Sequence, residues 1–194
     1  LVAQIPDPMR KIIRNHLYTF LERMPKTFDL RGASIGNLIL TAGYLTSRRM
    51  LDPVIFLFSK LVEVRGIVRP TVNKNYHLAA RLKNKQVVVG QHLITGKETP
   101  KLSSPIKQLF LTESEINPIS SIVPIRDKMN HLITQADLIC YPMGSFYTSI
   151  LANFLPEQVG TAVAANHCPK VYIPNTLADP EQRDMSLLSA VDTI

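Results

Sequence analysis

The last third of the chain alternates apolar strand-like runs with helical patterns, and short connections join them. Residues 137–141 and 170–174 are the two apolar runs, and the helical patterns of residues 147–154 and 156–166 lie between them. Two strands joined through a helix run parallel, because the helix carries the chain back to the edge from which it started. The alternation therefore predicts an α/β fold with a mostly parallel sheet flanked by helices.

The first 64 residues instead carry apolar side chains at helical spacing. We expect one helix over residues 7–24, which Pro25 ends, and a second that begins after Gly32 and its neighbours. Asp52 and Pro53 are typical of a helix start, so a third helix is predicted over residues 52–64.

The middle of the chain changes to the two-residue period of strands. Strands are predicted over residues 67–72, 76–82 and 86–89, with shorter ones over residues 92–94 and 106–111. They form an antiparallel middle section, and the polar, proline-containing residues 95–105 are predicted to be a mobile loop.

Length and composition limit the class of protein. The 194 residues fit one domain, so we expect a single α/β domain over residues 1–194 that is incomplete at both ends. At the N-terminal end the reason is that the chain starts without a methionine. The apolar runs are far shorter than the roughly 20 residues that a bilayer demands, which excludes a membrane-spanning chain. No leader pattern is present, so we expect a cytoplasmic protein whose cysteines, Cys140 and Cys168, are reduced and buried.

The charge balance favours anionic partners without choosing among them. Lys and Arg number 22 against 15 Asp and Glu, a formal net charge of +7. Nucleic acid ranks last among these partners, because the basic clusters carry no interleaved aromatic residues for base stacking.

The turn after the first apolar strand of the last third is the strongest candidate for a binding site. Gly144 allows a sharp turn and a close approach to a ligand. Ser145, Thr148 and Ser149 place hydroxyl groups beside the free N–H groups of a helix start, which suits phosphate or carboxylate. An ordinary helix start capped by Ser145 explains the same pattern equally well.

A second candidate turn precedes the second predicted helix. Gly32 and Gly36 flank Ser34, and Asn37 follows. The spacing is neither that of a P-loop nor that of a full dinucleotide-binding fingerprint. By itself it favours helix packing through small residues.

Other site chemistries lack their patterns. Ser145 lacks the flanking glycines of a nucleophile elbow, which leaves a hydrolase little support. The five histidines are dispersed without a metal-type pair, so a histidine-rich metal site is not expected. No paired carboxylates are evident near the two turns, and Asp179 and Glu181 are expected to be only loosely placed.

Both turns carry a family resemblance. The chain resembles the CofD-like family of 2-phospho-L-lactate transferases, which includes the bacterial gluconeogenesis-factor branch (YvcK). The resemblance rests on three runs, Gly32-Ala33-Ser34-Ile35-Gly36-Asn37-Leu38, Gly144-Ser145-Phe146-Tyr147-Thr148-Ser149-Ile150-Leu151-Ala152-Asn153, and Ala165 to Asn175. The stretch 68–72 is compatible with the family stretch that opens the middle strands.

The resemblance implies a Rossmann-like fold and a pocket for a phosphorylated nucleotide or nucleotide-sugar ligand. The transferases move a phospholactyl-type group from a guanosine diphosphate carrier onto a deazaflavin alcohol with Mg²⁺, whereas the gluconeogenesis-factor branch resembles a nucleotide-sugar sensor. A homodimer is left open. The ligand- and phosphate-binding residues implied here are Gly32, Ser34, Gly36, Asn37, Gly144, Ser145, Tyr147, Thr148, Ser149 and Asn175; no catalytic residue is assigned.

Departures from the family leave two functions open. The glycine-rich loop and the Asp-Asp stretch that open family members have no counterpart in this sequence, and Pro142-Met143-Gly144 stands where the family has Gly-Pro-Gly. One hypothesis is transfer of a phospholactyl-like group from a nucleotide diphosphate carrier. The alternative is a non-catalytic nucleotide-sugar-binding regulatory protein.

Overall fold

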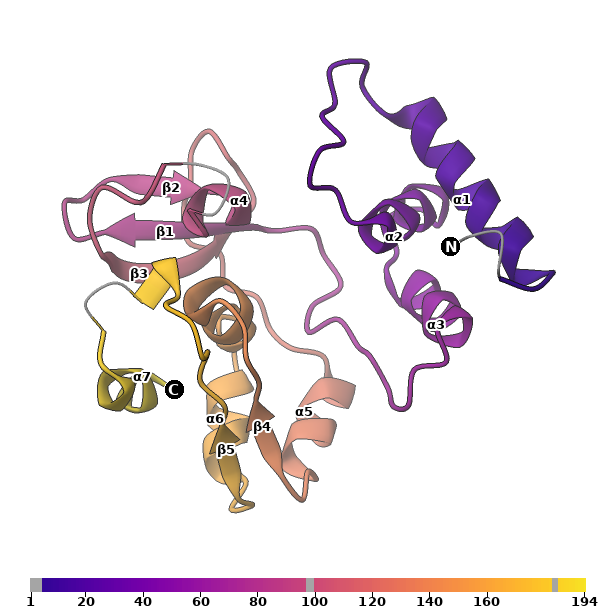
Figure 1. Cartoon of the computed structure of the whole chain (residues 1–194). Helices are drawn as coiled ribbons and strands as arrows, with labels where there is room; N and C mark the ends of the chain where they lie inside the picture. Colours follow the sequence, from indigo (N-terminus) through magenta and orange to yellow (C-terminus); the bar gives the residue numbers. More distant parts are fainter. Residues whose placement is uncertain (1–4, 97–99, 183–184) are drawn as a thin grey trace. The chain divides into compact units, whose positions relative to one another are not determined.

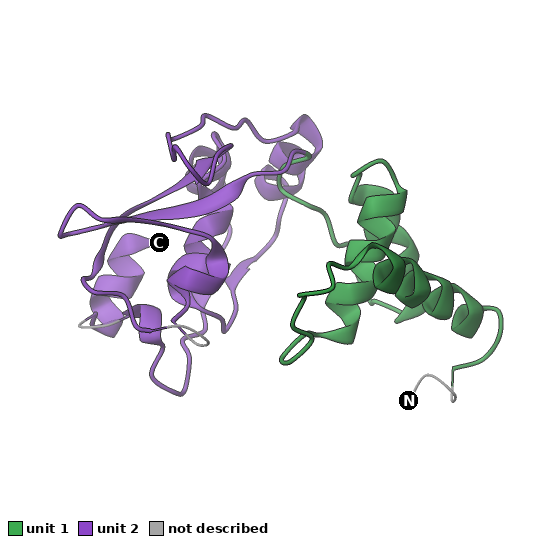
Figure 2. Ribbon diagram, turned by 90° about the horizontal axis from the view of Figure 1, so that it is seen from above, with its two compact units in different colours: residues 1–73 green, residues 74–194 purple. Residues whose placement is uncertain are grey.

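The chain divides into two compact units, Leu1–Asn73 and Lys74–Ile194 (Figures 1 and 2). The computed structural model describes residues 5–96, 100–182 and 185–194, and each unit is described by itself. Compact units can be parts of one domain, so the expectation of a single domain stays a prediction.

Three helices make up the first unit, and they confirm the three that the sequence predicts. These are α1 (Met9–Arg23), α2 (Ile35–Thr46) and α3 (Asp52–Leu61). Helix α2 packs against both others, and its Gly43 lies against Val54 of α3. A Cβ atom on Gly43 would lie only 2.5 Å from Cγ1 of Val54, so a small residue is what lets the two helices meet.

An antiparallel sheet opens the second unit and confirms the predicted middle section. Its strands are β1 (His77–Leu82), β2 (Val87–Val89) and β3 (Ile106–Thr112), in the order β2-β1-β3. Ala80 lies opposite Val88 on one side and opposite Leu109 on the other. One face of this sheet is covered by a core that includes Leu82 and the short helix α4 (Gln91–Ile94).

The strands of the last third pair in parallel, as the alternation of strand and helix predicts. Strand β4 (Ile139–Tyr141) pairs with β5 (Lys170–Tyr172), and Tyr141 lies opposite Tyr172. Helix α5 (Asp127–Thr134) precedes β4, and α6 (Val159–Ala165) lies on the connection to β5. The fold is thus α/β with both kinds of pairing. In the described part of the chain this is the one parallel pair of strands, and the larger sheet is antiparallel, so the expectation of a mostly parallel sheet is wrong.

The segment after β4 departs from the single α-helix predicted over residues 147–154. It forms a π-helical turn, η2 (Phe146–Ile150), followed by a 3₁₀ turn, η3 (Leu151–Phe154). The N–H groups of both Ser149 and Ile150 donate to the carbonyl oxygen of Ser145, at 2.8 and 3.3 Å. The Ser145 carbonyl therefore accepts from residues four and five positions further along the chain, and the five-residue spacing widens the helix at its start.

Two predicted strands are wrong for local reasons. Residues 67–72 are irregular: Pro70 has no N–H to donate to a ladder, and Ile67 is 73% exposed. Residues 92–94 belong to helix α4, because Gly90 has a φ of +106° and turns the chain out of strand geometry. The predicted loop 95–105 includes residues 97–99, which lie outside the described residues.

The last strand is partly exposed, and the two thiols are less buried than predicted. Val171 in β5 is exposed, because a two-stranded sheet shields little of its outer face. Cys140 is exposed and Cys168 is half-buried, so the expectation of two buried thiols is wrong, and both thiols are free.

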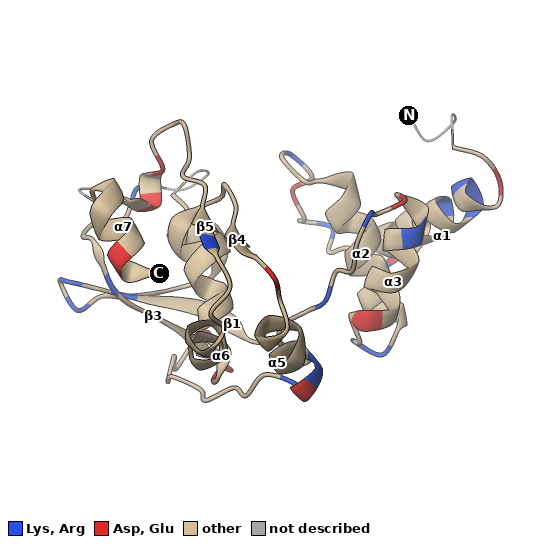
Figure 3. Ribbon diagram, turned by 90° about the horizontal axis from the view of Figure 1, so that it is seen from below, with Lys and Arg blue, Asp and Glu red and all other residues tan. Residues whose placement is uncertain are grey.

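Charge is distributed unequally between the two units (Figure 3). The first unit carries 11 Lys and Arg against 5 Asp and Glu, whereas the second carries 11 against 10. Nearly all of the surplus positive charge therefore belongs to the three-helix unit. Among the described helices, none has the length and apolar character needed to cross a membrane.

Candidate functional site

The candidate site is built where the two parallel strands end. Strand β4 leads into residues 142–145 and β5 leads into residues 173–181, so both segments leave the same edge of the sheet. Asn175 ties them together with its side-chain amide. Its Nδ2 donates to the carbonyl oxygen of Gly144 at 2.8 Å, and its Oδ1 accepts from the N–H of Gly144 at 3.1 Å. The structure thus brings together two residues that the family resemblance implies for one site.

Two carboxylates bind the N–H groups at the start of η2. The N–H of Phe146 donates to Oδ2 of Asp179 at 2.7 Å. The N–H groups of Tyr147 and Thr148 donate to Oε2 of Glu181 at 2.7 and 2.9 Å, and the Thr148 hydroxyl donates to Oε1 of Glu181 at 2.6 Å. The donor-rich turn that the sequence indicates therefore exists, and in this structure its N–H groups bind anionic side chains of the same chain.

The placement of these carboxylates corrects the expectation that they are loosely held. Glu181 lies in the short turn η4 (Pro180–Gln182) and is only 6% exposed. Oδ1 of Asp179 accepts from the N–H of Glu181 at 3.1 Å, which fixes the two side chains relative to one another. One sequence signal could have revealed them: they follow β5 at a distance that allows them to reach the turn after the neighbouring strand β4.

Tyr147 fixes the turn to the surrounding core. It packs against the core of the antiparallel sheet and also against the core around Phe146 and Tyr141. The rings of Tyr147 and Phe146 meet edge to face, with centroids 5.4 Å apart. Burial raises the pKa of the Tyr147 hydroxyl above its ordinary value, and the negative charge of Glu181 raises it further.

The predicted hydroxyl residues divide into buried and exposed ones. Ser145 and Thr148 are buried within the turn, whereas Ser149 is exposed. Ser149 lines an open pocket of about 310 Å³ together with Pro142, Met143 and Asn153. We call the side of the turn that faces this pocket its outer side. Of the three hydroxyl residues of this turn, Ser149 is thus the one placed to meet a ligand from solvent.

Glycine is favoured at position 144 because there is little room for a side chain, and not because the backbone angle is unusual. Its φ is not positive, so the turn does not require glycine for conformation. A Cβ atom there would lie 3.2 Å from Cβ of Ser149, a tight approach. The close neighbour here is Ser149 of the same turn, and the close approach of Gly144 to a ligand stays a prediction.

The predicted residues of the first unit gather at the start of α2. Gly32 has a φ of +74°, a conformation that favours glycine. Ser34 is the N-cap residue of α2, and both it and Asn37 are exposed. A Cβ on Gly36 would lie 3.6 Å from the ring of Phe58 in α3, which agrees with packing through a small residue.

These two groups of predicted residues belong to different units. Ser34 lies in the first and Ser145 in the second, and each group is assembled within its own unit. That they share one pocket stays a prediction.

The carboxylates at the turn do not fit a Mg²⁺ ion. The four carboxylate oxygens of Asp179 and Glu181 each accept from an N–H or O–H group, and the partial positive charge of those donors opposes a cation. Across residues 5–96, 100–182 and 185–194, no three His, Cys, Asp or Glu side chains are grouped so as to hold a metal ion.

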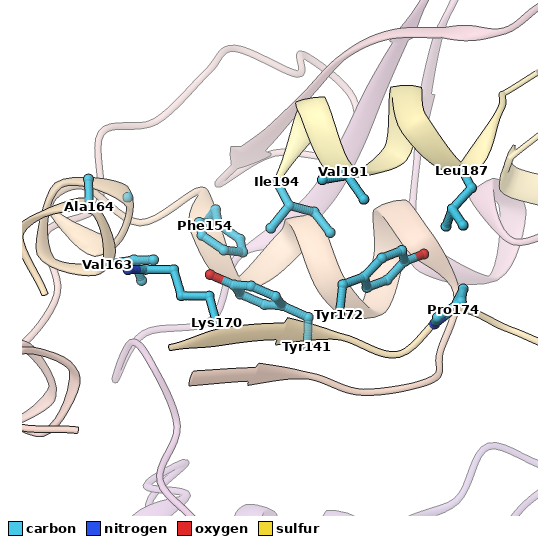
Figure 4. Close-up of a pocket in the computed structure, with 11 residues that line it drawn as sticks. Tyr141, Phe154, Val163, Ala164, Lys170, Tyr172, Pro174, Leu187, Val191 and Ile194 are labelled. Atoms are coloured by element: carbon cyan, nitrogen blue, oxygen red, sulfur yellow. The ribbon is translucent and has the colours of Figure 1, made fainter. Parts of the chain in front are cut away.

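A larger pocket, of about 530 Å³, lies over one face of the parallel strands (Figure 4). Tyr141 and Tyr172 lie along the strands on its floor. Val191 of α7 (Leu187–Thr193) and Ile194, which directly follows this helix, face them. Burial raises the pKa of the Tyr141 hydroxyl, and the charge of Cys168 adds to this shift. Sequence reasoning missed this pocket, because its lining is mostly apolar.

The family model described as 2-phospho-L-lactate transferase CofD matches residues 9–194. The gluconeogenesis factor of Bacillus subtilis (strain 168) is 36% identical over 161 residues, which cover 83% of this chain and 47% of that protein. The gluconeogenesis factor of Halalkalibacterium halodurans is 32% identical over 165 residues, 85% of this chain and 47% of that protein. The chain thus spans about half the length of these curated relatives.

Solved structures agree with the sequence relatives. A crystal structure of a Bacillus halodurans protein superposes with a TM-score of 0.66 at 28% identity, over 83% of this chain and 48% of that one. A second crystal structure of the same protein, described as a member of the UPF0052 family, gives a TM-score of 0.66 at 25% identity, over 98% of this chain and 60% of that one. The resemblance carried by the two turns is confirmed.

Proposed function

We propose that this chain, which belongs to the family of 2-phospho-L-lactate transferase CofD, binds a phosphorylated nucleotide-type ligand at the turn of residues 144–149. The observation that carries the proposal is the joining of the two segments that follow β4 and β5. Ligands of open α/β sheets bind outside the carboxyl ends of their strands, and a Rossmann-like arrangement would place a ligand at this edge.

The outer side of the turn supplies the binding surface. Ser149 and Asn153 line the pocket of about 310 Å³, a volume at the small end of those that hold ligands. The Ser149 hydroxyl can donate to a phosphate oxygen, and such a bond to a charged group contributes about 1.5–3 kcal/mol. In the first unit, the ligand-binding residues proposed at the start of α2 are Ser34, Gly36 and Asn37.

We favour a regulatory binding protein over a transferase. The observation that supports this choice is the commitment of Asp179 and Glu181 to the N–H groups of the turn, which removes the nearest carboxylates from acid–base or cation-binding work. The relatives named gluconeogenesis factor agree with it. Transfer of a phospholactyl-like group is the second candidate, and the description of the family model is the observation that favours it. The residues at the turn do not fit Mg²⁺, so no step is derived through that ion.

Calorimetric titration with guanosine and uridine diphosphates and a uridine diphosphate sugar, with and without Mg²⁺, tests the proposal. We expect saturable binding without consumption of the nucleotide. Ser149→Ala should raise the Kd about 10- to 100-fold, the loss of one hydrogen bond to a charged group. Ser120→Ala, which removes another exposed hydroxyl of the second unit, is the matched control and should leave the Kd unchanged.

Two outcomes would contradict the proposal. Absence of saturable binding to all of these nucleotides would exclude the ligand class, and equal Kd values for Ser149→Ala and wild type would exclude the turn. Consumption of a phospholactyl nucleotide carrier would replace the regulatory function with the transferase function. Because Ser145 is buried, its substitution disturbs the fold as well as the surface, so Ser149→Ala is the cleaner variant.

A further inference from the structure

We propose that Asp179 and Glu181 are positioning residues that hold the turn of residues 144–149 in the shape that receives its ligand. The inference rests on the proposed function, because it concerns the same turn. In this inference the carboxylates of the segment after β5 act as an internal anion. They accept hydrogen bonds from the N–H groups of the turn, while the outer side of the turn remains open to a ligand.

The segment after β5 binds most of the N–H groups of the turn. The Asn175 amide pairs with Gly144, and the consecutive N–H groups of residues 146–148 are bound first by Asp179 and then twice by Glu181. The distances to the two carboxylates, 2.7–2.9 Å, are those of charge-assisted hydrogen bonds, which are about twice as strong as neutral ones. The orientation of the turn is therefore set by the segment after the neighbouring strand.

Burial makes this arrangement durable. Glu181 is 6% exposed, and three donors of the chain point at its carboxylate. Removal of one partner from a buried, charged set leaves the others without compensation. A ligand phosphate cannot take the same N–H groups while the carboxylates are in place, because like charges would meet. The phosphate is then directed to the exposed hydroxyl of Ser149.

Two roles of the carboxylates, positioning the turn or blocking its N–H groups, predict opposite changes in nucleotide affinity when the Glu181 charge is lost. If Asp179 and Glu181 position the turn, loss of the Glu181 charge loosens the turn and weakens nucleotide binding. If instead they block an anion site, the same loss frees the N–H groups and strengthens binding. The direction of the change in affinity decides between the two.

The experiment compares Glu181→Gln, Glu181→Ala and the control Glu157→Gln, in which the side chain is exposed and the backbone makes the recorded hydrogen bonds. Amide hydrogen exchange at residues 146–148 and the Kd for uridine and guanosine diphosphate are measured. We expect exchange and Kd each to rise about tenfold in Glu181→Gln and further in Glu181→Ala, with wild-type values in Glu157→Gln.

Two added readouts separate positioning from a general loss of fold. Formate added to Glu181→Ala should restore amide protection at residues 147 and 148, whereas chloride at equal ionic strength should not. In Glu181→Gln the Tyr147 hydroxyl, followed by NMR, should titrate at lower pH than in wild type, because the neighbouring charge that raises its pKa is gone. Both effects depend on the carboxylate itself.

The results that overturn the inference are distinct from those that overturn the proposed function. Tighter nucleotide binding by Glu181→Gln, or unchanged exchange at residues 146–148, shows that the carboxylates do not position the turn. If wild type binds no nucleotide, the proposed function is wrong, and the exchange data still decide whether Glu181 orders the turn. If Glu181→Ala does not fold, Glu181→Gln carries the test.

Discussion

Substitution of Gly43 by alanine tests how helix α2, which carries the turn of Ser34 and Asn37, is seated in the first unit. The added Cβ would lie 2.5 Å from Cγ1 of Val54, and 3.2 Å from Nε2 of His16. Carbon atoms in good contact lie about 3.5–4.0 Å apart, so α2 and α3 must separate by about 1 Å.

The expected magnitude is the difference between two opposing effects. Overpacking of a core costs about 1–3 kcal/mol. Replacement of glycine by alanine inside a helix returns about 1 kcal/mol. Since Val54 is buried and cannot move into solvent, the upper part of the overpacking range applies, and Gly43→Ala should lower the free energy of unfolding by about 1–2 kcal/mol.

Urea unfolding followed by far-UV circular dichroism measures this change, and the chain offers a matched control. Gly160 lies in helix α6, and a Cβ there would meet nothing within 4 Å, so Gly160→Ala should raise stability by about 0.5–1 kcal/mol. In the Gly43→Ala background, Val54→Ala should cost less than it does alone, because it removes the colliding methyl groups. Equal stabilisation by Gly43→Ala and Gly160→Ala would refute the described packing of α2 on α3.

Three further predictions concern the turns and the thiols. Gly36→Ala should leave the free energy of unfolding in urea unchanged or slightly raised, because its Cβ would make only ordinary contacts. The same variant should weaken nucleotide binding in calorimetry, and unchanged binding would remove Gly36 from the site. The raised pKa of Tyr147 means that the folded state holds this proton more tightly, so stability falls as the pH rises above about 10, and Tyr147→Phe should show a smaller fall in thermal unfolding between neutral and alkaline pH. Cys140, being exposed, should react with a thiol reagent faster than the half-buried Cys168, and Cys140→Ser should abolish the fast phase; equal rates would contradict the described burial.

The spacing of apolar residues is sufficient to predict the helices and strands that bury one face. The three helices of the first unit, the antiparallel middle strands and the parallel pair β4 and β5 follow from apolar spacing, because burial of one face is what fixes each of them. Residues 67–72 have strand-like spacing without a partner strand, and a single sequence does not show whether a partner is available. Spacing predicts a strand over residues 92–94, but the positive φ of Gly90 redirects the chain into helix α4.

The candidate site was predictable in part for a related reason. Its N–H donors follow from the position of Gly144 and Ser145 after a strand, and the family resemblance implies that Asn175 belongs with them. The anionic partners, Asp179 and Glu181, were not predicted to be bound there, because contacts between residues more than 30 positions apart depend on which strands are neighbours. Only the pairing of β4 with β5 brings the two segments together.

The most direct test of the proposed site is to follow the backbone amides by NMR while a nucleotide diphosphate is added. If the turn binds the ligand on its outer side, shifts should saturate and centre on residues 142–153, and the amides of residues 146–148 should stay protected from exchange. Saturable shifts centred elsewhere in the chain, or loss of protection at residues 146–148 as the nucleotide binds, would contradict ligand binding at a turn held in place by its own carboxylates.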